Sequence, residues 1–154
     1  MTSKNTSYHL LRVSLALSLL AFAFSCNEGA PKPAKVYYGE DMCAHCQMLI
    51  SEPNFVGQFL PANGKVKKFD DIGCLVAKLE EESETPRAIF VASYEDSGWL
   101  NAENATFLKS EKLHTPMSFG LAAFPDREAA KEARAEFGGE ILSYQQLKQP
   151  DLQE

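Results

Sequence analysis

A chain of 154 residues is long enough for one globular domain or two very small ones. It contains 15 basic and 21 acidic residues; without Lys4 and Arg12, which belong to the N-terminal segment described next, 13 basic residues remain and the net charge is −8. This acidic balance argues against a nucleic-acid partner and against a polybasic surface for membrane binding.

The first 25 residues have the features of an export signal. Two basic residues precede the apolar run 13–24, which is too short to span a bilayer comfortably. The run leads into Cys26 in the order Ala-Phe-Ser-Cys, which is similar to a bacterial lipobox, although the usual leucine is absent. We expect a lipoprotein signal peptide at 1–25 and a lipid on Cys26 that holds the protein on a membrane surface. The alternative is an ordinary secretory signal cleaved nearby.

A folded domain is expected over residues 36–150, after a Pro-rich, polar and flexible tether at 26–35. Its first half, about 36–95, predicts two strands, a helix and a third strand. The two strands, 55–60 and 65–69, are joined by an Asn-Gly turn. Asp70 or Asp71 caps the helix, which has an apolar stripe and is followed by a buried strand at 88–94.

The second half, about 96–150, repeats this order. It predicts strands at 105–108 and 119–124, a helix from Asp126 to Phe137, and a last strand at 140–143, followed by a helical turn. Two glycines stop the helix, as is usual at a helix C-terminus. The fold class is therefore α+β, with two tandem ββαβ units. Each unit is too small for a secure core, so we expect the pair to pack as one small body.

Soft metal ligands are concentrated in residues 42–48, which hold two thiols, two thioethers and one imidazole. Thiolates and thioethers favour Cu(I), whereas imidazole is shared among copper, zinc, iron and nickel. If Cys26 carries lipid, three cysteines remain, and three thiols cannot all pair within one chain. One of them, Cys74, lies beside the apolar stripe of the first helix, and we expect it to be a small buried residue rather than a ligand.

The pair Cys43-x-x-Cys46 admits three uses. Thiol–disulfide exchange usually places the pair after a core strand at a helix N-terminus, but a polar segment precedes it here. Structural zinc needs a second pair of ligands, and the sequence has no second Cys-x-x-Cys or His-x₃-His. Cu(I) accepts two or three soft ligands, so Cys46-x-Met48 with a distant Met117 would suffice. His45 is a further candidate, and Met42 and His114 remain open.

Several motifs recur in an order that is typical of one family. They are Asp-x-Cys-x-x-Cys-x-Met-x-Ile at 41–50, Gly-Lys at 64–65, Phe-Asp-Asp-Ile-x-Cys at 69–74, Trp99 with Ala102 and Ala105, and Pro-Met-x-x-Gly-x-x-Ala-Phe at 116–124. Together they resemble the NosL family, the copper lipoproteins that accompany bacterial nitrous oxide reductase. The resemblance covers residues 36 to about 147.

The resemblance implies a monomeric, non-enzymatic Cu(I)-binding protein, lipid-anchored on the periplasmic side of a bacterial membrane. Its partners would be a membrane ABC-type assembly complex and nitrous oxide reductase, and its fold would be related to organomercury lyase. Cys46, Met48 and Met117 match the family's sulfur ligands. Cys43 is an addition that many members lack, and Gln47 replaces a common glycine. The rivals are an exported thiol–disulfide oxidoreductase, an organomercurial-cleaving enzyme and a heavy-metal scavenger.

Overall fold

The computed structural model describes residues 29–148, so the predicted signal peptide and the predicted lipid site at Cys26 lie outside the described residues. The chain is already attached to the folded domain at Ala34. The N–H of Ala34 donates to Oε1 of Gln58 over 2.8 Å, and its carbonyl accepts from Nε2 of Gln58 over 3.1 Å. The end of the predicted tether therefore lies on the domain. Within residues 29–148, no helix has the length and apolar character needed to cross a membrane.

The first unit forms a four-stranded antiparallel sheet with one helix. A short 3₁₀ turn, η2 (Pro53–Phe55), takes the start of the first predicted strand. The elements that follow are β1 (Gly57–Leu60), β2 (Lys67–Phe69), α2 (Ile72–Glu81), β3 (Ala88–Ala92) and β4 (Trp99–Asn101). The strand order is β2-β1-β3-β4. The first strand of the unit therefore lies between its hairpin partner and the strand that follows the helix.

The second unit repeats this topology in a three-stranded sheet. Its elements are β5 (Thr106–Lys109), β6 (Leu121–Phe124), α3 (Arg127–Phe137), β7 (Glu140–Ser143) and the short α4 (Tyr144–Leu147). The strand order is β6-β5-β7, which matches β2-β1-β3 of the first unit. The predicted α+β fold of two ββαβ units is confirmed.

The strand β4 was not predicted. It lies in the sequence assigned to the second unit, yet it pairs antiparallel with β3, with Ala92 opposite Trp99. The first sheet therefore extends to Asn101, past the predicted unit boundary at residues 95–96. A three-residue strand is too short to show the alternation of apolar and polar residues from which strands are predicted.

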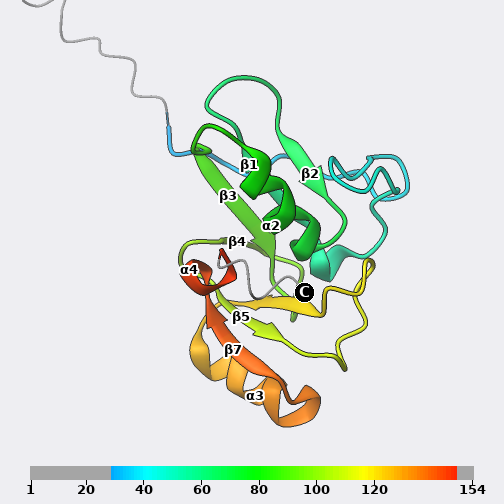
Figure 1. Ribbon diagram of the computed structural model, residues 1–154, viewed down its shortest axis with the longest axis vertical. Coiled ribbons are helices and arrows are strands. Elements are labelled where there is room, and N and C mark those ends of the chain that lie inside the picture. The colour runs from blue at the N-terminus through cyan, green and yellow to red at the C-terminus, as the bar shows by residue number, and fades with distance from the viewer. Residues whose placement is uncertain (1–28, 149–154) are drawn as a thin grey trace, which may run out of the picture. The chain divides into compact units, whose positions relative to one another are not determined.

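The two units share one hydrophobic core. Figure 1 shows the sheets one above the other, with α2 on the first sheet and α3 on the outer side of the second. The largest cluster of buried side chains joins Phe59 and Leu75 of the first unit to Phe107 and Leu142 of the second. The sheets also meet at their edges, where the N–H of Tyr94 donates to the Ala123 carbonyl over 2.8 Å. The units therefore pack as one body, as their small size requires.

Capping residues fix where both long helices begin. Asp71, not Asp70, caps α2, and its side chain accepts from the Gly73 N–H over 2.7 Å. Asp126 caps α3 in the same way. The Asp71 cap fixes the start of α2 and with it the position of Cys74, the third residue of that helix.

Candidate metal centre

The segment 37–50, called here the cysteine loop, folds back on itself and carries the Cys-x-x-Cys pair at its tip. Ile50 N–H donates to the Asp41 carbonyl over 2.9 Å, and Cys43 N–H donates to the Met48 carbonyl over 2.8 Å. The tip is attached to the first sheet because the Ala44 N–H donates to the carbonyl of Lys68 in β2 over 2.8 Å.

An ion pair braces the base of the cysteine loop. The Lys68 ammonium lies 2.7 Å from Oδ2 of Asp41, which also accepts from the Tyr37 N–H over 2.7 Å. These two donors lower the pKa of Asp41 below its ordinary value, with the Lys68 hydrogen bond as the larger cause. The loop is therefore fixed at its base and at its tip before any ligand binds.

Three thiols converge where the cysteine loop meets α2. The Sγ atoms of Cys43, Cys46 and Cys74 all lie within 4.8 Å of one another, and we call this group the thiol cluster. All three are free thiols; Cys43 and Cys74 are buried and Cys46 is partly exposed. A thiolate–zinc bond is about 2.3 Å long, so two sulfurs on one ion lie at most about 4.6 Å apart. A small adjustment of the side chains would let all three hold a single ion.

Hydrogen bonds favour the thiolate form at one member of the cluster. The Cys74 thiol donates to Cys43, and this bond is the main cause that lowers the pKa of Cys43 far below its ordinary value. Backbone N–H groups of Cys46, Asp70 and His45 act in the same direction, while burial opposes them. The same bond raises the pKa of Cys74, and burial raises that of Cys46. A thiolate held by several donors is a ready metal ligand.

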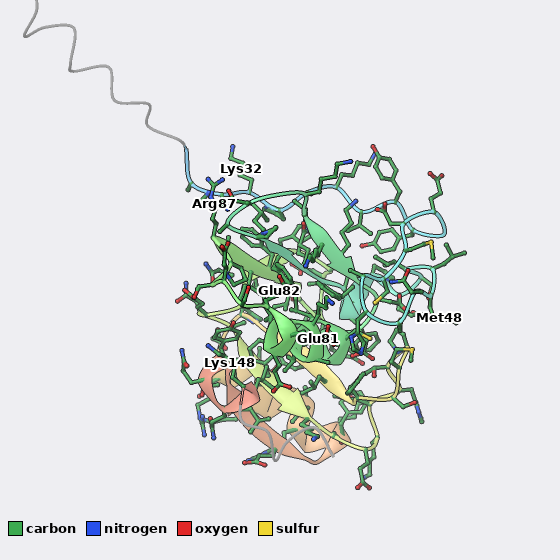
Figure 2. The ribbon with its side chains drawn as sticks, turned by 45° about the horizontal axis from the view of Figure 1, so that its top comes forward. Lys32, Met48, Glu81, Glu82, Arg87 and Lys148 are labelled. Atoms are coloured by element: carbon green, nitrogen blue, oxygen red, sulfur yellow. The ribbon has the colours of Figure 1, made fainter. Side chains whose placement is uncertain are left out.

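The predicted methionine ligands lie on the surface of the domain. Met48 is 58% exposed, in the cysteine loop, and Met117 is 39% exposed. Figure 2 shows Met48 at the edge of the molecule. The Met117 N–H donates to Oδ2 of Asp71 over 3.0 Å, which holds this residue at the N-terminus of α2, the end that carries Cys74. Met42 is also exposed, on the same loop as Met48.

Neither histidine candidate belongs to the group of side chains that converge at the thiol cluster. Nδ1 of His45 lies 3.9 Å from Oε1 of Glu81, the last residue of α2, whereas Cys74 is in the first turn. His114 is exposed beside a broad surface cleft between the 109–120 loop and the end of α3. The group of converging donors among the described residues is made of sulfur, without His45 or His114.

Cys74 is buried, as the helical pattern predicts, but its thiol also faces the thiols of Cys43 and Cys46. The helical pattern of 72–79 places Cys74 on the buried side and gives no information about what it meets there. The cysteine count was the one signal for a ligand role of Cys74. A third cysteine that has no partner beside a Cys-x-x-Cys pair in an exported protein is either buried or used.

Gln47, between Cys46 and Met48, has a φ of 64°, in the left-handed region that favours glycine. Replacing it by glycine is expected to raise the free energy of unfolding by about 1 kcal/mol, because the strain is relieved. Its side chain contributes only a long hydrogen bond of 3.3 Å to the Cys43 carbonyl. Urea denaturation would measure the change. Glu111→Gly, at an exposed position without positive φ, should lower stability, and an equal loss for Gln47→Gly would contradict the assignment.

Comparison with known proteins relates this chain to one family. A family model described as NosL matches residues 34–152, which is more than half of the chain. A search of curated proteins found no match. Among solved structures, the copper chaperone NosL from Shewanella denitrificans superposes with a TM-score of 0.67 and 22% sequence identity. The match covers 77% of this chain and 98% of that one, and at this identity it shows a shared fold.

Proposed function

This chain belongs to the NosL family, and from that premise we propose that it is a Cu(I)-binding metallochaperone that delivers copper for the assembly of nitrous oxide reductase. The observation that carries the proposal is the thiol cluster, in which three sulfur donors from two separate elements lie within reach of one ion. Soft thiolates favour Cu(I), and Cu(I) requires only two or three of them.

The mechanism we propose is ligand exchange, with copper as the cargo. The buried thiols of Cys43 and Cys74 keep the ion from solvent, and the partly exposed Cys46 connects them to the surface. Met48 and Met117 are exposed, so their thioethers can share the ion with an incoming partner. A partner that offers further soft ligands then takes the ion, and no bond of an organic substrate is made or broken.

The rival function, an exported thiol–disulfide oxidoreductase, fits the geometry less well. Such an enzyme attacks a protein disulfide with an accessible thiolate. The cysteine with the lowered pKa here is Cys43, whose side chain is fully buried. We therefore propose a non-enzymatic role.

The same premise supports a proposal for the location and the partners of the protein. We propose that Cys26 is lipidated, that the protein is a monomer on the periplasmic side of a bacterial membrane, and that it meets a membrane ABC-type assembly complex. The family resemblance and the signal-like sequence of residues 1–25 support this. Mass spectrometry of the mature N-terminus would test the lipid.

Titration with Cu(I) under reducing conditions, against a chromophoric Cu(I) chelator, tests the binding function. We expect one equivalent to bind and X-ray absorption to show sulfur neighbours. Met48→Ala should weaken binding more than tenfold, or by more than about 1.4 kcal/mol. Leu49→Ala is the matched control, because Leu49 is similarly exposed on the same loop and carries no sulfur. Absence of tight binding, or a site made of nitrogen and oxygen, would contradict the proposal, and reduction of insulin by the purified protein would favour the rival.

A further inference from the structure

One buried carboxylate joins the two segments of the chain that supply the distant sulfur donors. Asp71 is fully buried. Its Oδ1 accepts from the Gly73 N–H over 2.7 Å, and its Oδ2 accepts from the Thr115 hydroxyl over 2.7 Å and from the Met117 N–H over 3.0 Å. The first contact belongs to the helix that carries Cys74, and the other two belong to the segment 115–120, called here the Pro-Met loop.

The Pro-Met loop is organised around this contact. Thr115 Oγ1 also accepts from the Gly120 N–H over 3.2 Å, which closes the loop on itself. Ser118, next to Met117, has a φ of 62°, a conformation that a residue other than glycine adopts at a cost. The strained backbone therefore depends on its surroundings, and the Asp71 carboxylate is the part of those surroundings that binds the Met117 backbone directly.

Helix capping by itself does not account for a buried carboxylate. Asp126 caps α3 through two backbone N–H groups while lying exposed at the surface. Burial of a carboxylate is costly unless several donors satisfy it. At Asp71, two of the three donors come from the Pro-Met loop, so the carboxylate is placed to hold that loop as much as to cap the helix.

We propose that Asp71 is a positioning residue that holds the Met117 thioether at the copper site; this rests on the function proposed above. Both carboxylate oxygens of Asp71 already accept hydrogen bonds, and we do not assign Asp71 as a ligand. It fixes the Met117 backbone against the N-terminus of α2, so that two sulfur donors 43 residues apart in sequence, Cys74 and Met117, keep one relative position before copper arrives. Such preorganisation raises affinity because the loop does not have to be ordered during binding.

Asp71→Asn tests this inference. An asparagine keeps one accepting oxygen and presents an NH₂ donor in place of the other, so it can cap α2 but faces the donors of the Pro-Met loop with a donor. We expect Cu(I) affinity to fall about tenfold, as for loss of a charge-assisted hydrogen bond. X-ray absorption of the copper-loaded protein should show one sulfur neighbour fewer. In a Met117→Ala background, Asp71→Asn should have no further effect.

Three variants separate positioning from folding. Asp126→Asn makes the same substitution at the N-cap of α3 and should leave Cu(I) affinity unchanged. Thr115→Val removes a hydroxyl that binds Asp71, and should weaken copper binding, while Thr115→Ser retains the hydroxyl and should not. Circular dichroism would show that each variant is folded. If Asp71→Asn does not fold, the difference in Cu(I) affinity between Thr115→Val and Thr115→Ser tests the proposal.

The outcomes are distinct. If Met117→Ala weakens binding but neither Asp71→Asn nor Thr115→Val does, or if the effects of Asp71→Asn and Met117→Ala multiply in the double variant, the positioning role is wrong. If the unmodified protein does not bind Cu(I), the proposed function fails first. If it binds Cu(I) tightly but Met117→Ala changes nothing, the positioning role fails alone.

Discussion

Replacing Cys74 by serine is expected to weaken Cu(I) binding by at least about tenfold, which corresponds to about 1.4 kcal/mol of binding free energy. Serine has nearly the shape of cysteine and can still donate a hydrogen bond to Cys43, as the Cys74 thiol does. What the substitution removes is the soft donor, and a hydroxyl is a poor ligand for Cu(I). A chelator competition titration measures the loss, and X-ray absorption should count one sulfur fewer.

The matched control is Val76→Ala in the same helix. Val76 is buried in the same core as Cys74, so this variant also removes part of a buried α2 side chain, and it takes away no sulfur. It should lower the stability of the fold by a few kcal/mol at most and leave copper affinity close to that of the unmodified protein. If Cys74→Ser and Val76→Ala affect copper binding equally little, Cys74 is a packing residue and the site consists of fewer thiols than the cluster contains.

Replacing Gly73 by alanine is expected to lower the free energy of unfolding by more than about 2 kcal/mol. Helix propensity alone predicts the opposite, since alanine is favoured over glycine within a helix by about 1 kcal/mol. A methyl group at Gly73, however, would lie 2.0 Å from Cγ of Phe119 and 2.4 Å from its Cβ. Neither atom can move far, because Phe119 belongs to the Pro-Met loop that Asp71 holds in place.

Urea denaturation measures this loss, and α3 offers a control at the same helical position. Gly73 is the second residue of α2 and Glu128 the second residue of α3, where the side chain is exposed. Glu128→Ala should therefore be no less stable than Glu128→Gly. Because Phe119 is two residues from Met117, Gly73→Ala should also weaken Cu(I) binding. A Gly73→Ala protein of unchanged or greater stability would show that the close approach of Phe119 does not constrain the loop.

Local signals in the sequence determined most of the secondary structure. The helix predicted from Asp126 to Phe137 and the strand predicted at 140–143 agree with α3 and β7, because an N-terminal cap and two glycines mark where the helix starts and stops. Both hairpin strands are shorter than predicted. The first begins only at Gly57, because Pro53–Phe55 forms a 3₁₀ turn instead of extended chain. The repeated order of predicted strands and helices was sufficient to predict the two ββαβ units.

The sequence also determined where the candidate site lies, because soft ligands are concentrated in residues 42–48. Only the tertiary structure decided which side chains meet there. Helical periodicity places Cys74 on a buried face, but the fold brings the cysteine loop onto that face and turns the thiol toward Cys43. The carboxylate of Asp71 likewise meets the Pro-Met loop, and His45 meets Glu81, through contacts between segments distant in sequence. Such contacts depend on how two sheets and a helix pack around one core, and no local pattern of residues encodes that packing.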